Sequence, residues 1–140
     1  MSVADLKART QQIFDMFNTH DAVATAAFFA EDAELYDSGV VRPVVGAQQI
    51  AALYARHYSA IPDVHVHIDR MIAECNTVVA EWTCTGTHRG TFMGIPPTGK
   101  WVSYKGVSMV RYDRGIAVAI TRMWDLAGLL RQIGLLASRE

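Results

Sequence analysis

Hydrophobic residues recur at three- and four-residue spacing over most of the first 61 residues, and alternate with polar residues over most of the chain that follows. The first spacing is typical of helices and the second of strands. The pattern predicts helices over residues 2–18, 22–30, 46–61 and 126–136. It predicts strands over residues 33–36, 64–74, 77–87, 100–112 and 116–124. Pro62 ends the third helix, and Gly115 allows a tight turn between the last two strands.

This order of elements indicates an α+β fold, because helices come first and long strands joined by short turns come after them. We expect a curved antiparallel sheet, shaped as a cone or half-barrel, with three N-terminal helices and a short C-terminal helix enclosing a pocket. No repeat, low-complexity tract or linker interrupts the pattern, so residues 1–140 are predicted to form a single domain.

Composition narrows the possible partners of this domain. Hydrophobic residues make up 51% of the 140 residues and charged residues 19%, which excludes a disordered chain. The net charge is −1 and basic residues do not cluster, so we expect no nucleic-acid partner. No apolar stretch reaches the roughly 20 residues of a membrane span, so we expect no membrane partner.

The two cysteines indicate a reducing compartment. Cys75 is predicted at a hairpin turn and Cys84 far along the following strand, about 25 Å away at the rise of a strand. A disulfide cannot span that distance. The N-terminus carries an early aspartate and no basic segment, unlike a secretory signal, so we expect a cytoplasmic protein.

Three stretches of the sequence resemble the SnoaL-like polyketide cyclase family of the nuclear transport factor 2-like superfold. They contain GTHRG and GIPPTGK in residues 86–100, GVS and RY in residues 106–115, and WD and GLLRQ in residues 124–134. The resemblance implies a cofactor-free enzyme acting on a hydrophobic carbonyl compound. Its reaction would be ring closure by intramolecular aldol addition, through an enolate.

Asp125 is the general base that the resemblance implies, because it follows the last strand in the WD step. Strand alternation puts Asp125 on one face with Thr121 and Met123, and we expect this face to line the pocket. Desolvation in an apolar pocket would raise the pKa of the carboxyl group and make it a stronger base. The alternative is that Asp125 only caps the final helix.

Asp37 and His88 form a second candidate pair. Steroid-isomerase-like members of the superfold carry a base aspartate near the position of Asp37, but an aspartate before Ser-Gly is also typical of a turn. The first helix has no tyrosine to hold an oxyanion, which argues against a steroid isomerase. His88 either donates a proton to the substrate or bonds the loop backbone. Paired with Asp37, it would support a hydratase or dehydratase, because dehydratases of the superfold use a histidine and an aspartate.

Aromatic and apolar side chains are expected to line the pocket and bind the substrate. They are Phe14, Phe17, Tyr36, Tyr54, Tyr58, Trp82, Met123 and Thr121. Tyr54 and Tyr58 share a helical stripe with His57, a weaker candidate, and polar tips on such a stripe need partners or a wet cavity. Arg111 is near the place of a histidine that partners the base in some cyclases, and we expect it to face solvent.

The sequence leaves three alternatives to the cyclase. A limonene-type epoxide hydrolase needs an Asp–Arg–Asp set, and Arg111 with Asp113 has only part of it. His65, His67 and Asp69 resemble a metal site, but zinc needs at least three protein ligands and we expect none bound. A non-catalytic ligand carrier is the alternative from another class.

An apolar sheet face with Trp101 or Trp124 predicts a homodimer.

Overall fold

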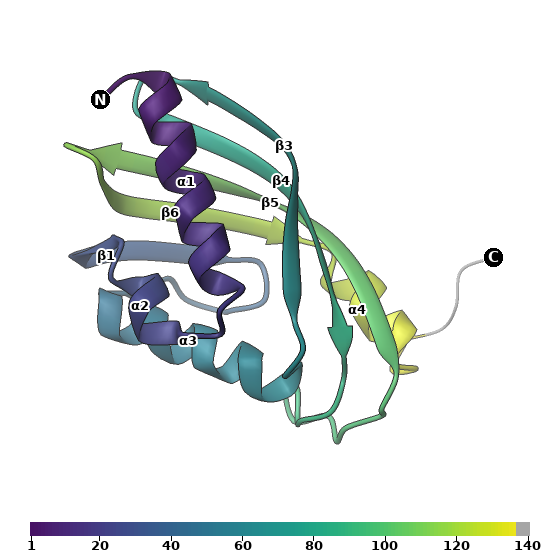
Figure 1. Cartoon of the computed structure of the whole chain (residues 1–140). Coiled ribbons are helices and arrows are strands. Elements are labelled where there is room, and N and C mark those ends of the chain that lie inside the picture. Colours follow the sequence, from purple (N-terminus) through teal and green to yellow (C-terminus); the bar gives the residue numbers. More distant parts are fainter. Residues whose placement is uncertain (137–140) are drawn as a thin grey trace.

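The computed structural model describes residues 1–136, so the last four residues of the predicted domain lie outside the described part. The helices are α1 (Val3–Phe17), α2 (Ala22–Ala26), α3 (Ala47–Ala60) and α4 (Leu126–Gln132). The strands are β1 (Phe29–Asp37), β2 (Val44–Val45), β3 (His65–Glu74), β4 (Thr77–Thr87), β5 (Trp101–Asp113) and β6 (Ile116–Trp124). The predicted α+β class is confirmed (Figure 1).

The six strands form one curved sheet in the order β2-β1-β6-β5-β4-β3. Strands β3 to β6 are joined in sequence as antiparallel neighbours, as the alternating pattern predicts. Strand β1 departs from this expectation, because it pairs with β6 in parallel. The two strands are separated by most of the chain, so no short turn fixes their relative direction.

Helices α1, α2 and α3 lie on one side of the sheet, and α4 packs against β5 at its far end (Figure 1). Helix α1 begins at the predicted capping box, in which Ser2 and Asp5 bond each other's backbone. It buries Ile13 and Phe14 against the sheet. Helix α3 buries Ile50 in the same way, so the helices cover the concave face of the sheet.

The segment after α2 differs from its prediction. Residues 22–30 are rich in alanine and were expected to be helical throughout, but α2 ends at Ala26 and β1 begins at Phe29. Phe29 is buried in the core and its backbone pairs with Ala117 of β6. Tertiary pairing therefore outweighs the local helix propensity here, and the strand is longer than residues 33–36.

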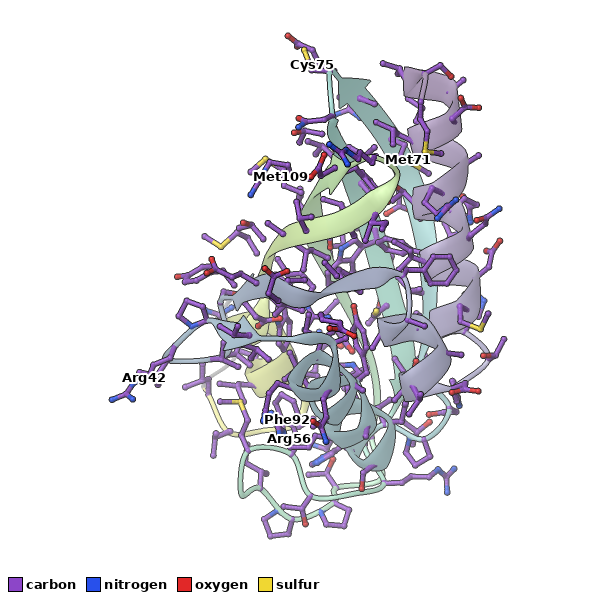
Figure 2. The ribbon with its side chains drawn as sticks, turned by 90° about the vertical axis from the view of Figure 1, so that its left-hand side faces the viewer. Arg42, Arg56, Met71, Cys75, Phe92 and Met109 are labelled. Atoms are coloured by element: carbon purple, nitrogen blue, oxygen red, sulfur yellow. The ribbon has the colours of Figure 1, made fainter. Side chains whose placement is uncertain are left out.

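The opposite face of the sheet carries exposed apolar side chains, among them Val107, Met109 and Met123. Figure 2 shows Met109 on the side of the sheet away from α1. The homodimer expected from such a face stays a prediction. Within residues 1–136, no helix has both the length and the apolar character that a membrane crossing requires.

Candidate active site

An inner cavity of about 70 Å³ lies between the helices and the concave face of the sheet. Most of its walls are apolar or aromatic: Ile13, Phe14, Phe17, Tyr54, Val66, Trp82, Val110, Ile120 and Trp124. The polar groups that reach it are Thr25, His57, Cys84, Tyr104, Ser108 and Arg122. A mostly apolar space with a few polar groups is typical of a small-molecule site.

A second, outer pocket of about 290 Å³ shares His57, Arg122 and Trp124 with the inner cavity. These three residues therefore lie at the boundary between the two spaces. Figure 2 shows Arg56 and Phe92 at the lower end of the molecule, where both line the outer pocket.

Asp37, which is buried, and Arg122, whose side chain is 18% exposed, form an ion pair at this boundary. Arg122 donates from Nε to Asp37 Oδ2 at 2.7 Å, and its Nη2 contacts the same oxygen. The other carboxylate oxygen, Oδ1, accepts from the backbone N–H of Gly39 at 2.7 Å and from the indole N–H of Trp124 at 2.9 Å. Asp37 is 2% exposed, so four donors saturate a carboxylate that solvent hardly reaches.

The electrostatics of the pair favour its charged form. Burial alone would raise the pKa of Asp37, but Arg122 together with the hydrogen bonds from Trp124 and Gly39 lowers it below the ordinary value. The Arg122 guanidinium also lies over the ring of Tyr54, 5.5 Å from its centroid, in a cation–π contact. The cationic group is thereby fixed from two sides beside the inner cavity.

His57 and Tyr104 form a second polar pair, with 2.5 Å between His57 Nε2 and the tyrosine hydroxyl. Burial, and secondarily the nearby Arg122, lowers the pKa of His57 to about 4. Burial raises the pKa of Tyr104 well above its ordinary value. Both side chains are therefore neutral at physiological pH.

Four of the predicted substrate-binding residues line the inner cavity: Phe14, Phe17, Tyr54 and Trp82. Two others lie elsewhere. Tyr58 donates its hydroxyl to the backbone oxygen of Phe17 at 2.7 Å and stacks on His20, so its polar tip is already bonded. Tyr36 is exposed, on the face of β1 opposite Asp37.

The expectation that Asp125 lines the pocket with Thr121 and Met123 is wrong. The side chains of β6 that reach the cavity are Ile120, Arg122 and Trp124, so the alternation has the opposite phase, and Met123 is 54% exposed. Asp125 is exposed, and its Oδ1 accepts from the backbone N–H of Gly128 at 2.9 Å, capping α4. A strand with hydrophobic residues on both faces does not reveal its phase.

His88 is 1% exposed, and it organises the loop after β4. Its Nδ1 accepts from the backbone N–H of Thr98 at 3.2 Å, which matches the loop-bonding alternative. Among the described residues, its Nε2 has no hydrogen-bond partner. His88 does not line the inner or the outer pocket and has no hydrogen bond to Asp37, so the expected pairing of these residues is not formed in residues 1–136.

Sequence reasoning missed Arg122 and Tyr104 and underrated His57. Asp37 lies directly opposite Arg122 in the register of β1 and β6, and Leu35 opposite Ile120. The sequence does show an acidic residue near the end of one strand and a basic residue near the end of another. These two residues indicate an ion pair only once the parallel pairing of the two strands is known.

The epoxide-hydrolase and metal interpretations are not supported by the positions of their residues. Arg111 and Asp113 are exposed on the strand, outside both pockets. No three His, Cys, Asp or Glu side chains in residues 1–136 are grouped closely enough to hold a metal ion. Cys84 reaches the inner cavity, and burial raises the pKa of its thiol to about 12, so it stays protonated.

Comparison with known proteins identifies relatives of this fold. The family model described as SnoaL-like polyketide cyclase matches residues 7–133. The solved structure of AclR from Streptomyces galilaeus, a proposed hydroxylase, is 27% identical with a TM-score of 0.89. The alignment covers 99% of this chain and 87% of AclR.

Two more distant structures share the fold. A proposed SnoaL-like polyketide cyclase from Jannaschia sp. CCS1 is 20% identical with a TM-score of 0.86, over 97% of this chain and 94% of the other. IdmH, a proposed polyketide cyclase from Streptomyces antibioticus, is 22% identical with a TM-score of 0.80, over 92% and 98%. Among proteins with curated functions, none matches this sequence significantly.

Proposed function

The chain belongs to the SnoaL-like polyketide cyclase family, and we propose that it is a cofactor-free enzyme acting on a hydrophobic carbonyl compound. The reaction removes a proton from a carbon next to a carbonyl group and closes a ring by intramolecular aldol addition. The observation that carries this proposal is the Arg122 guanidinium, held by Asp37 beside an apolar cavity.

Arg122 is suited to stabilise the negative charge that develops on the substrate oxygen. A guanidinium has five N–H donors, and Asp37 accepts from Nε and Nη2. Among residues 1–136, Nη1 donates to no acceptor, and the side chain lines both pockets. A fixed cation in an apolar site stabilises an enolate more strongly than water does, because it needs no reorganisation during the reaction.

Asp37 acts in this proposal as a positioning residue, not as the base. Its two oxygens already accept from Arg122, Trp124 and Gly39. Taking a proton would break at least one of these bonds and leave the Arg122 charge without its counterion. The role of Asp37 is to aim the guanidinium and to keep it charged.

In this proposal, the two pockets bind different parts of the same substrate molecule. The inner cavity, about 70 Å³ in volume, accommodates the reacting part, and the outer pocket, about 290 Å³, takes the remainder. Phe14, Phe17 and Trp82 enclose the reacting part. Holding two carbonyl-bearing segments in one orientation supplies the entropic part of catalysis.

The test uses a bicyclic β-diketone, the acetyl derivative of α-tetralone, whose enolate has its own absorbance. We expect binding to lower the pKa of this compound by about 1 to 3, as an opposite charge at close range does. Arg122→Gln should abolish the shift, whereas Arg70→Gln, at an exposed arginine of β3, should keep it. An unchanged pKa in the bound state would refute enolate stabilisation by Arg122.

Hydroxylation of the same kind of substrate is the second candidate, because the proposed hydroxylase AclR is 27% identical to this chain. Both reactions place a carbonyl compound in the same cavity. Product mass separates them, since aldol ring closure leaves the mass unchanged, whereas hydroxylation by dioxygen with an added two-electron reductant puts one oxygen atom into the product and releases the other as water. An added oxygen in the product would favour the hydroxylase over the cyclase.

A further inference from the structure

We propose that His57 is the proton acceptor of this site and that Tyr104 positions it. This inference rests on the proposed enolate chemistry, and it names the group that the chemistry still needs. Neither the family resemblance nor the sequence pattern assigned a catalytic role to either residue.

His57 has the position that a proton acceptor requires. It projects from α3 and lines both the inner cavity and the outer pocket, together with Arg122. One ring nitrogen, Nε2, is bonded to the Tyr104 hydroxyl at 2.5 Å. Among residues 1–136, the other nitrogen, Nδ1, has no hydrogen-bond partner and is available to a ligand.

In the proposal, Tyr104 holds His57 in the tautomer that leaves the Nδ1 lone pair free. A neutral imidazole carries one proton, and the hydrogen bond of one nitrogen decides where it resides. A tyrosine hydroxyl can donate or accept in this bond; in the proposal it accepts from Nε2–H, so that the lone pair is at Nδ1. The phenol is buried, packs edge-on against the imidazole at 6.1 Å between centroids, and fixes the ring orientation as well.

The charges balance during the proposed step. The C–H bond of the substrate breaks, its proton moves to Nδ1, and its electron pair becomes the enolate held by Arg122. The new imidazolium and the guanidinium then flank one negative oxygen, which offsets their mutual repulsion. When the enolate carbon attacks the second carbonyl, the alkoxide that forms takes the proton back from Nδ1.

The other acid–base candidates are less well placed. The four acceptor positions of Asp37 are occupied by Arg122, Trp124 and Gly39. Asp125 is exposed at the start of α4. His88 bonds the loop after β4 and lines neither pocket. Of these residues, only His57 has a neutral acceptor atom beside Arg122.

The experiment measures the exchange of the α-protons of α-tetralone for deuterium in D₂O by NMR. His57→Gln should lower the exchange rate by at least about 100-fold, the usual contribution of general base catalysis. His67→Gln, at an exposed histidine of β3, should leave it unchanged. Tyr104→Phe should slow exchange about 10-fold or more, whereas Tyr112→Phe, whose hydroxyl bonds Thr10 away from both pockets, should not.

A rescue experiment separates a chemical role from a structural one. In His57→Ala, added imidazole should restore the exchange, while thiazole, a ring of the same shape but far weaker basicity, should not. Equal rescue by both compounds would overturn the inference. So would full exchange in His57→Gln, or exchange lost only in Asp37→Asn.

The outcome for His57 is independent of the outcome for Arg122. Binding to the His57→Gln variant should still lower the pKa of the β-diketone, because Arg122 remains in place. A pKa shift in this variant would also show that it is folded. If the wild type gives no pKa shift, the proposed function fails. If the shift persists and only the exchange result is negative, His57 is not the base and the proposed function stands.

Discussion

Asp37 and Arg122 lie opposite each other at the ends of β1 and β6, the one parallel strand pair in the described sheet, and their side chains form a largely buried ion pair. The chain thus brings two charges 85 positions apart into direct contact beside an apolar cavity. A buried pair of this kind costs desolvation energy, which argues that the site retains it for function.

Asp37→Asn should lower the free energy of unfolding by about 3 kcal/mol, because it leaves the Arg122 charge buried without a counterion. Urea denaturation measures the change. The matched control is Glu81→Gln, which breaks the exposed pair of Arg70 and Glu81 at 2.6 Å and should cost at most about 1 kcal/mol. Equal effects of the two substitutions would mean that the Asp37 pair is not buried in solution.

Stability should fall as the pH is lowered from about 6.5 towards 4, the interval between the ordinary pKa of histidine and the lowered pKa of His57. In this interval the unfolded chain binds a proton that the folded chain does not, so the loss reaches about 3 kcal/mol. Asp37 adds a loss in the same direction at still lower pH, because its pKa is below the ordinary value.

The measurement is urea denaturation across this pH interval. His57→Gln should flatten the profile between about pH 6.5 and 4. The exposed His67→Gln should leave the profile as in the wild type. A profile unchanged by His57→Gln would contradict a neutral, buried imidazole at the boundary of the two pockets.

Gly106→Ala should disturb two cavity walls at once. A Cβ atom at this position would lie 2.4 Å from the Trp82 ring and 2.7 Å from Trp124 Cβ. We expect a stability loss of about 1–3 kcal/mol, typical of overpacking, and weaker binding of the β-diketone. Thermal unfolding and a binding titration measure the two effects. Val107→Ala, at the exposed neighbour, is the control and should leave binding unchanged.

Asp125 should prove to be a helix cap. Asp125→Ala should cost about 1 kcal/mol of stability through the lost bond to the Gly128 backbone, and Asp125→Asn much less. Neither substitution should change α-proton exchange of α-tetralone, because Asp125 is exposed and lines neither the inner nor the outer pocket. Loss of exchange in Asp125→Asn would restore this aspartate as the base.

The sequence pattern predicts strands β3 to β6 within one residue at each end, because long strands joined by tight turns have strong local signals. The turn before β6 is a clear case, since Gly115 has the positive φ of 80° that its place in the turn requires. The start of β1 could not be predicted, because Phe29 is held by a strand that follows some 90 residues later.

The site was only partly predictable for a related reason. The spacing of hydrophobic residues predicts four aromatic side chains that line the cavity. It does not predict which face of β6 lines the cavity. Both faces of this strand carry hydrophobic residues, and the charged Arg122 lies on the face that lines the cavity, so hydrophobicity alone does not decide between them. Only the parallel pairing with β1 supplies Asp37 as the counterion that makes a buried Arg122 possible.

A crystal structure of the complex with the acetyl derivative of α-tetralone would show where the substrate oxygens bind. We expect a ligand oxygen within hydrogen-bond distance, about 2.7–3.2 Å, of Arg122 Nη1, with the acidic carbon facing His57 Nδ1. Arg122 should remain bonded to Asp37 in the complex. A ligand bound with both oxygens away from Arg122, or next to Asp125 on the outer side of the sheet, would show that Arg122 does not stabilise the enolate.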